Sequence, residues 1–234
     1  MQRLLAGVLN FRRHIFQTKR ELFSRLATPQ NPQALFITCS DSRICPSLIT
    51  QSSPGDLFVV RNAGNIVPPW PHGGGETASI EYAVEVLKVR DIVVCGHTHC
   101  GAMAGILEQN ALDSTMPALA AWLQHADAAY KFVAGEYGHL PKHMQMERLI
   151  EANVLLQIES LATIPAVAKA LARDELDIYG WVYRIENGEV RTFNLDSASF
   201  EPVTDALINA PRGVPTLVHR VSAETCDTDI ESVR

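Results

Sequence analysis

Two short motifs contain the residues best suited to chemistry, Cys39-Ser-Asp-Ser-Arg43 and His97-Thr-His-Cys100. Thiolate sulfur and imidazole nitrogen are ligands that zinc prefers, usually in a tetrahedron. Two cysteines and one histidine would supply three ligands and leave the fourth position for water or a carboxylate, as in catalytic rather than structural zinc sites. The two motifs together predict a catalytic zinc site.

Asp41 and Arg43 could control the fourth position of this site. Asp41 is close enough to Cys39 in the sequence to compete for the metal. Arg43 could instead hold the carboxylate away, because a guanidinium group binds a carboxylate through two parallel hydrogen bonds. The motif therefore indicates a switchable site, although the same pair could be an exposed ion pair of little energetic value.

His99 leaves the third ligand ambiguous. It lies between His97 and Cys100 and could replace His97 or act outside the ligand shell. The spacing favours His97 as the ligand. Cys45 and Cys95 lie in or beside apolar runs and are expected to be small buried side chains, as unpaired cysteines often are.

Alternating strand-like and helix-like segments must position these motifs. Short apolar runs bounded by turn residues indicate buried parallel strands, and the Asn187-Gly188 turn indicates a hairpin near the end of the domain. The predicted strands are 34–38, 57–60, 91–95, 178–185 and 190–193, and the predicted helices are 76–89, 101–109, 117–130, 144–161 and 165–173.

Ligand sites of open parallel sheets form at the carboxyl ends of the strands. Cys39 directly follows the first predicted strand, and His97 and Cys100 follow the third, so two separate loops could meet over one metal. Cys100 also precedes the predicted helix 101–109, whose positive N-terminal end would stabilise a thiolate.

Composition limits the remaining possibilities. The chain has 234 residues, of which 47% are hydrophobic and 20% charged, enough to bury the core of one domain with extensions. Its net charge of −6 and mixed charge pattern argue against a nucleic-acid partner. No apolar run approaches the length of a membrane span, so no membrane association is expected. Five irregularly spaced cysteines do not suggest a disulfide framework, which favours a reducing, cytoplasmic location.

The two ends of the chain are interpreted separately from the domain. Residues 1–20 contain basic but no acidic side chains, with apolar residues at helical spacing. We interpret them as an amphipathic helix that packs on the protein or on a partner subunit. A single domain is expected over 1–205, with a helical arm over 1–30 and a tail over 206–234 that could be partly disordered.

Four ordered motifs make the sequence similar to a known family. Besides the two already described, these are Pro54-Gly-Asp-Leu-Phe-Val-Val-Arg-Asn-Ala-Gly-Asn65 and Glu81-Tyr-Ala-Val84, and the late Gly180-Trp-Val-Tyr183 fits as well. Over roughly residues 1–200 the chain resembles the β-class carbonic anhydrases. Its overall sequence most resembles the bacterial enzymes associated with cyanate degradation.

The resemblance implies an α/β fold, with a mostly parallel four-stranded sheet, an added edge strand, flanking helices and an N-terminal helical arm that reaches a neighbouring subunit. It implies a homodimer or a higher homo-oligomer and one zinc ion per chain. The implied activity is zinc-hydroxide-dependent reversible hydration of carbon dioxide to bicarbonate and a proton. Cys39, His97 and Cys100 match the zinc ligands, and Asp41 and Arg43 match the catalytic dyad.

Further residues match the substrate pocket of that family. Gln30 would donate a hydrogen bond to a substrate oxygen, while Phe58 and Tyr82 would form an apolar wall. Phe58 could equally be a core residue, and Gln30 could be part of a polar loop.

One departure from the family pattern bears on regulation. Some members bind bicarbonate at a separate inhibitory site built from Trp, Arg and Tyr. Arg61 and Tyr183 match that site, but Phe36 occupies the tryptophan position and has no N–H donor. We therefore expect a constitutively open metal site.

Two other functions remain as alternatives. The same fold and metal could hydrolyse carbon disulfide or carbonyl sulfide, as in some relatives that have a narrowed entrance. The chain could also be a non-enzymatic structural or redox zinc module in which Asp41 permanently closes the metal. An open fourth position argues against the second alternative, because structural zinc usually has four protein ligands.

Overall fold

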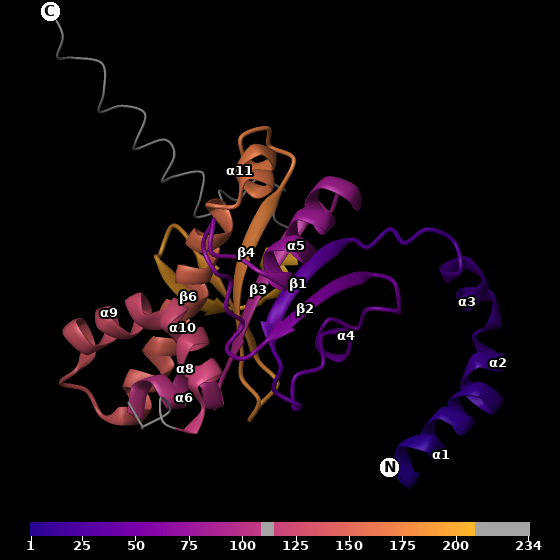
Figure 1. Cartoon of the computed structure of the whole chain (residues 1–234), viewed down its shortest axis with the longest axis horizontal. Helices are drawn as coiled ribbons and strands as arrows, with labels where there is room; N and C mark the ends of the chain where they lie inside the picture. Colours follow the sequence, from indigo (N-terminus) through magenta and orange to yellow (C-terminus); the bar gives the residue numbers. More distant parts are fainter. Residues whose placement is uncertain (109–114, 209–234) are drawn as a thin grey trace, which may run out of the picture.

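A six-stranded sheet forms the centre of the molecule (Figure 1). The computed structural model describes residues 1–108 and 115–208 of the chain. The strand order is β2-β1-β3-β4-β5-β6; the first four strands are parallel to their neighbours, and β5 and β6 are antiparallel. The strands are β1 (Ala34–Cys39), β2 (Leu57–Asn62), β3 (Asp91–His97), β4 (Asp177–Tyr183), β5 (Val190–Asn194) and β6 (Ser199–Pro202).

The sheet confirms the predicted α/β fold but has one strand more than expected. The four-stranded parallel core is present, and two antiparallel strands follow it instead of one. β6 has only four residues, and Phe200 is the buried one, packed against Phe193 at a ring-centroid distance of 5.3 Å. A segment with a single buried side chain has no alternating pattern from which a strand could be predicted.

Helices are present in the positions that the periodicity predicts, although two of the predicted helices are divided, and the short α4 and α12 were not predicted. The predicted helix 76–89 is α5 followed by the π-helical segment η2, and it ends early because Lys88 adopts a positive φ of 55°. The predicted helix 117–130 is divided at η3, whose three residues form a 3₁₀ turn. The helices of the domain are α4 (Pro46–Ile49), α5 (Gly75–Glu81), η2 (Tyr82–Val86), α6 (Gly101–Glu108), α8 (Pro117–Leu123), η3 (Gln124–Ala126), α9 (Asp127–Tyr137), α10 (Lys142–Ala162), α11 (Pro165–Leu171) and α12 (Asp205–Ile208).

The core lies between α10 and the centre of the sheet. Leu149, Val154 and Ile158 of α10 are at most 1% exposed. Gly96 of β3 and Gly180 of β4 face this helix, and a Cβ atom at Gly96 would lie only 2.8 Å from Cγ2 of Val154. Glycine at these strand positions therefore allows the helix to pack directly on β3, which ends at the predicted ligand His97, and on its neighbour β4.

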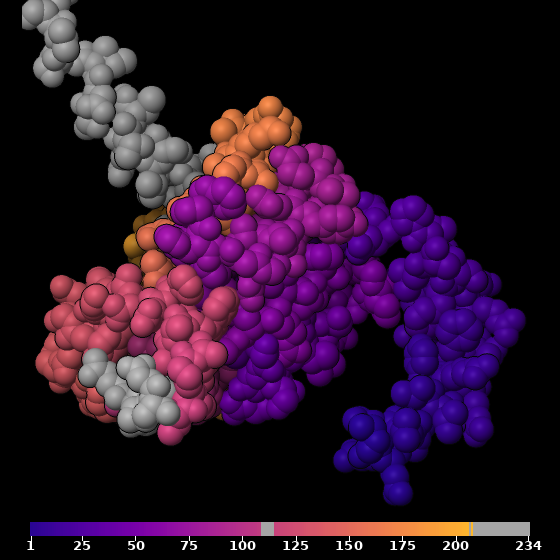
Figure 2. Space-filling model, viewed as in Figure 1, coloured from indigo at the N-terminus to yellow at the C-terminus, as the bar shows by residue number. Residues whose placement is uncertain are grey.

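The N-terminal helices project from the body of the molecule (Figures 1 and 2). None of the residues of α1 is buried, and apolar side chains such as Leu4, Leu5 and Val8 are 57–68% exposed. This apolar stripe agrees with the amphipathic pattern of the sequence, and most of the basic residues follow α1. The helical part consists of α1 (Gln2–Asn10), η1 (Phe11–Ile15), α2 (Phe16–Thr18) and α3 (Arg20–Leu26).

Two further predictions concern the chain ends and membranes. The predicted tail 206–234 lies outside the described residues except for 206–208, which belong to α12. Within 1–108 and 115–208, no single helix is both long enough and apolar enough to cross a membrane; only α10 and α11 taken together meet both requirements, and this pair is bent by 90°.

Replacing Gly96 with alanine should destabilise the protein. The new methyl group would lie within 3.2 Å of both Val154 and Ile150, which are held in the core, so we expect a loss of about 1–3 kcal/mol in the free energy of unfolding. Urea denaturation measures this change. Gly135→Ala in α9 is the matched control, because its Cβ meets no atom within 4 Å and alanine favours a helix. Equal stability of the Gly96→Ala variant and the wild type would contradict the close packing described here.

Candidate metal centre

The metal centre is built where two adjacent parallel strands end. β1 ends at Cys39 and β3 ends at His97, and the two strands pair in register from Ala34 with Asp91 to Thr38 with Cys95. Cys100 follows in the loop after β3. The two sulfur atoms and one ring nitrogen of His97 lie within 4.8 Å of one another, and the three residues are 5%, 0% and 1% exposed in chain order.

The ring of His97 is held in one orientation. Its Nδ1 lies 2.9 Å from the carbonyl oxygen of Thr98, which can only accept, so Nδ1 carries the proton. Its Nε2 is buried and has no hydrogen-bond partner in the described part of the chain. Thr98 is fixed in turn, because its hydroxyl donates to Glu186 at 2.7 Å and accepts from the N–H of Ile185 at 3.0 Å. The unpartnered Nε2 is thus a preoriented ligand of the kind that metal sites use.

A hydrogen bond couples the thiols of Cys39 and Cys100 and shifts their pKa values in opposite directions. A hydrogen bond from the Cys100 thiol lowers the pKa of Cys39 to about 4, and the N–H of Gly64 also points to Cys39 Sγ at 3.4 Å. The Cys39 thiolate and burial raise the pKa of Cys100, although backbone N–H groups at the start of α6 oppose this shift. A cation between the sulfur atoms would favour loss of the second proton, since metal binding displaces protons from thiols.

These properties fit zinc. Two sulfur donors and an imidazole nitrogen match the donor set that zinc prefers, and the buried Nε2 of His97 is left without another partner. The set offers three protein ligands, which leaves the fourth position open as in catalytic zinc sites.

Arg43 holds the carboxylate of Asp41 firmly. Arg43 Nε donates to Oδ1 at 3.0 Å, Nη2 donates to Oδ2 at 2.7 Å, and the backbone N–H of Arg43 donates to Oδ1 at 2.9 Å. These bonds hold the pKa of Asp41 well below its usual range. Oδ2 nevertheless lies 3.9 Å from His97 Nε2, so the paired carboxylate borders the ligand cluster.

Sequence reasoning missed the contacts that fix the loop after β1. Arg61 donates from Nε to the carbonyl of Cys39 at 3.1 Å and from Nη2 to the carbonyl of Asp41 at 2.7 Å. Gly64 has a φ of +83°, and a Cβ there would lie 3.0 Å from Met103, so glycine lets its N–H approach the sulfur of Cys39. The run Arg61-Asn-Ala-Gly-Asn65 was the feature of the sequence that could have indicated these contacts.

His99 does not belong to the ligand cluster. Its φ is +57°, its side chain is 67% exposed, and its Nε2 lies 3.7 Å from Glu186. Its carbonyl oxygen accepts a hydrogen bond from Arg43 Nη2 at 3.0 Å, which ties the second motif to the first.

The other cysteines differ from each other. Cys95 is fully buried, as expected, and burial raises its pKa to about 12. The expectation that Cys45 is buried was wrong, because Cys45 immediately precedes α4 at the surface and is exposed.

The structure does not bring the predicted substrate residues to the metal cluster of the same chain. Phe58 pairs with Leu35, four residues before Cys39, which places it roughly 13 Å away along the strand direction. Tyr82 is 42% exposed and packs on Phe58 with a ring-centroid distance of 6.0 Å. Gln30 is exposed and lies four residues before β1 begins. All three sit towards the amino ends of the strands, whereas the metal cluster lies at the carboxyl ends.

The residues matched to the inhibitory anion site have other contacts. Phe36 is 1% exposed and packs edge-on against Trp181 with a ring-centroid distance of 5.9 Å. Arg61 is engaged with the loop carbonyls, and the carbonyl of Tyr183 accepts a hydrogen bond from the N–H of Thr98 at 3.0 Å. The absence of an anion site here remains a prediction.

Comparison with known proteins identifies the family. The family model described as carbonic anhydrase matches residues 34–190, which include both motifs. The solved structure of the β-carbonic anhydrase CcaA superimposes with a TM-score of 0.85 and 46% identity, covering 87% of this chain and 99% of that one. The chain belongs to the β-carbonic anhydrase family.

Further members are similar over most of their length. A carbonic anhydrase of Pseudomonas aeruginosa is 48% identical over 200 residues, which cover 85% of this chain and 89% of the relative. Structures of tetrameric β-carbonic anhydrases from Sordaria macrospora match with a TM-score of 0.73 and 32% identity, covering 82% of this chain and 95% of that one. The fold and family predicted from the motifs are therefore confirmed, whereas the narrower resemblance to cyanate-associated enzymes remains a prediction.

Replacing either cysteine of the cluster with serine should remove zinc. An alcohol is a poor zinc ligand at neutral pH, so Cys39→Ser and Cys100→Ser should each lower the zinc content from about one ion per chain to nearly none. Atomic absorption on the purified proteins measures this ratio. Cys45→Ser is the control, because Cys45 is exposed and lies outside the cluster. Full zinc content in both cluster variants would refute the ligand assignment.

Proposed function

We propose that this protein catalyses the reversible hydration of carbon dioxide to bicarbonate and a proton, with one zinc ion per chain bound by Cys39, His97 and Cys100. The observation that carries the proposal is the cluster of these three buried ligands beside a carboxylate that Arg43 holds in place. The carbonic anhydrases of similar sequence and structure support the same reaction.

The metal and the protein would have separate tasks. Zinc bound at this cluster would act as a Lewis acid that makes water nucleophilic near neutral pH. His97 presents Nε2 to the metal because Thr98 holds the opposite nitrogen, and the buried position of all three ligands keeps the cluster's geometry fixed.

Asp41 would orient the attacking water. Its carboxylate stays ionised because Arg43 donates three hydrogen bonds to it, and an ionised carboxylate can only accept hydrogen bonds. An acceptor beside the metal cluster aligns the O–H of the water and directs its lone pair to the carbon atom of the substrate. The same pairing with Arg43 keeps Asp41 from taking the open position, which supports the expected open form and argues against a closed structural zinc module.

Two copies of the chain would complete each substrate pocket. Gln30, Phe58 and Tyr82 lie too far from the metal cluster of their own chain to line it, yet Tyr82 is partly exposed and free to face another molecule. The projecting α1 has an uncovered apolar stripe that suits contact with a second copy. We propose a homodimer, or a higher assembly such as the tetramers of the Sordaria macrospora relatives, in which the pocket residues of one copy approach the metal cluster of the other.

Stopped-flow measurement of carbon dioxide hydration tests the proposed reaction. The zinc-loaded protein should turn over carbon dioxide already at the neutral end of a series from about pH 6.5 to 9. Carbonyl sulfide and carbon disulfide are assayed beside it and should be poor substrates. Hydrolysis of carbonyl sulfide or carbon disulfide without carbon dioxide hydration would show that the protein is instead a hydrolase of those compounds. If the zinc-loaded protein were inactive on all three substrates, the non-enzymatic zinc module would be the remaining function.

Arg43→Ala should reduce turnover without removing zinc. Asp41 would lose its partner and become free to coordinate the metal, so we expect turnover to fall by about 100-fold or more at unchanged zinc content. Arg148→Ala, which breaks an exposed pair with Glu151, is the control. If activity fell only in proportion to lost zinc, the role assigned to the pair of Asp41 and Arg43 would be wrong.

Mixed dimers test the shared pocket. Cys100→Ser lacks a metal ligand, and the double variant Gln30→Ala/Tyr82→Ala lacks pocket residues, so each homodimer should be almost inactive. A mixed dimer, isolated with two affinity tags, has one intact metal cluster facing one intact pocket and should regain about half of the wild-type turnover. Mixed dimers of Cys39→Ser with Cys100→Ser are the control and should stay inactive, because both residues belong to one cluster. Equal inactivity of the two mixtures would contradict the shared pocket.

A further inference from the structure

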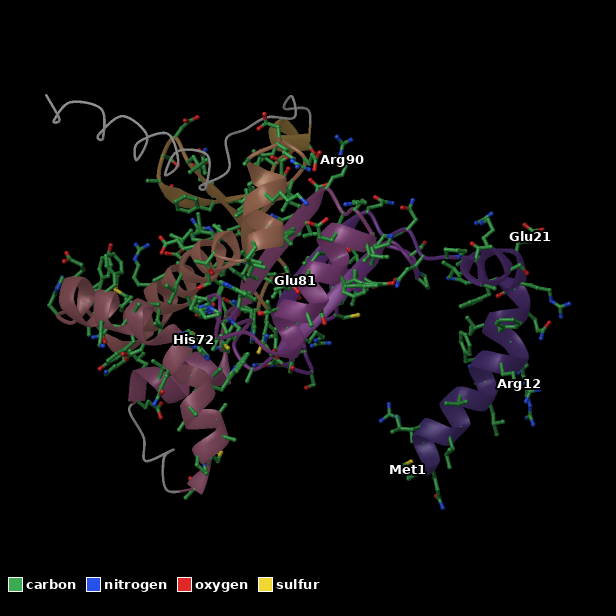
Figure 3. All side chains as sticks on the ribbon, turned by 45° about the horizontal axis from the view of Figure 1, so that its top comes forward. Met1, Arg12, Glu21, His72, Glu81 and Arg90 are labelled. Atoms are coloured by element: carbon green, nitrogen blue, oxygen red, sulfur yellow. The ribbon has the colours of Figure 1, made fainter. Side chains whose placement is uncertain are left out.

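A cavity lies at the opposite end of the sheet from the metal centre. Its volume is about 420 Å³, and η2 and α11 form its walls together with the segments that precede β3 and β4. Arg90, labelled in Figure 3, directly precedes the first residue of β3, and Glu175 lies two residues before β4. Since Cys39 and His97 are the last residues of β1 and β3, this cavity is separate from the metal centre.

The floor of this cavity is apolar. Val84, Val89, Ala166 and Ala170 line it and are only 4–8% exposed. Alanine at two of these positions leaves space that a larger side chain would fill. The floor can therefore contact the carbon framework of a small organic molecule, as in most ligand pockets of this size.

The rim of the cavity carries an excess of positive charge. Four basic side chains, from Lys88, Arg90, Lys169 and Arg173, line it together with the acidic Glu85 and Glu175. Both lysines bind Glu85, at 3.2 Å and 3.3 Å. Among residues 1–108 and 115–208, no carboxylate oxygen lies within 4.0 Å, the limit of an ion pair, of the guanidinium nitrogens of Arg90 or Arg173. The two guanidinium groups are thus the cations available to a ligand.

The backbone at the rim has an uncommon conformation. Lys88 has a φ of 55°, in the left-handed region that residues other than glycine seldom adopt. This residue turns the chain from η2 into Val89 on the cavity floor and directly precedes the segment with Arg90. A left-handed residue is a common way to end a helix, and here the N–H of Val89 bonds back to the carbonyl of Ala83.

We propose that this cavity binds a small organic anion that carries a phosphate or carboxylate group on an apolar body. Arg90 and Arg173 would bind the charged group, because a guanidinium group donates paired hydrogen bonds to phosphate and carboxylate oxygens alike. The apolar floor contacts the body of the ligand. Gathering like charges around one cavity is unfavourable by itself, and an anion between the arginines removes that repulsion. The inference does not depend on the proposed hydration activity.

Isothermal titration calorimetry on the full-length, zinc-loaded protein tests the site with three probes. Phenyl phosphate and phthalate each combine an apolar ring with about two negative charges, carried by one phosphate group in the first and by two carboxylates in the second, whereas inorganic phosphate has no apolar body. At least one aromatic probe should bind once per chain and more tightly than inorganic phosphate. Whichever aromatic probe binds more tightly indicates whether the natural ligand carries a phosphate or a carboxylate group. The proposal would be overturned if none of the three probes bound at concentrations up to about 10 mM, because a dissociation constant above that value is too weak for a functional site.

Variants locate the binding. Arg90→Gln/Arg173→Gln should weaken the aromatic probe at least about tenfold, since each lost hydrogen bond to a charged group is worth that much. Ala170→Leu fills the floor and should also abolish binding while it keeps both arginines. Lys142→Gln, at the exposed start of α10, is the control for lost positive charge and should bind normally. Unchanged binding in the double arginine variant and in Ala170→Leu would show that the probe occupies the metal centre or another surface, and the proposal would fail.

Discussion

The parallel pairing of β1 with β3 is the constraint on which the site depends. It brings the carboxyl ends of the two strands together, so that Cys39 and His97, distant in the sequence, end beside each other. The pairing is held from one side by α10, which packs on β3 and β4 through glycines at Gly96 and Gly180. The same packing buries β3, the strand that ends at the ligand His97. The chemistry of the site is therefore tied to the packing of the core.

A second layer of contacts decides what the three ligands can do. The carboxylate of Asp41 could close the metal, but Arg43 binds both of its oxygens and is itself tied to the carbonyl of His99. Arg61 holds the same loop from β2 through the carbonyls of Cys39 and Asp41. Hydrogen bonds from two arginines thus keep an acidic side chain beside the cluster as an acceptor. This arrangement separates a catalytic metal site from a structural one.

The local features of the fold could be predicted from the sequence, whereas features set by register and strand order could not. Apolar runs located β1 to β5, and the donor chemistry of Cys39, His97 and Cys100 indicated the metal cluster before any geometry was known. β6 was not predicted because it buries a single side chain, Phe200. The placement of Phe58 and Tyr82 away from the cluster follows from the pairing of Phe58 with Leu35, which the sequence motif does not reveal. The basic cavity is invisible in the sequence for the same reason, since its residues come from segments that only the strand order brings together.

A crystal structure of the zinc-loaded protein, with anomalous data collected at the zinc edge, tests the central claim most directly. The account predicts one zinc ion per chain bonded to Cys39 and Cys100 at about 2.3 Å and to His97 Nε2 at about 2.0 Å. Asp41 should remain bound to Arg43, and the fourth position should hold water or another small exchangeable ligand. An Asp41 oxygen bonded to the zinc at neutral pH, or zinc bound away from these three residues, would contradict the account.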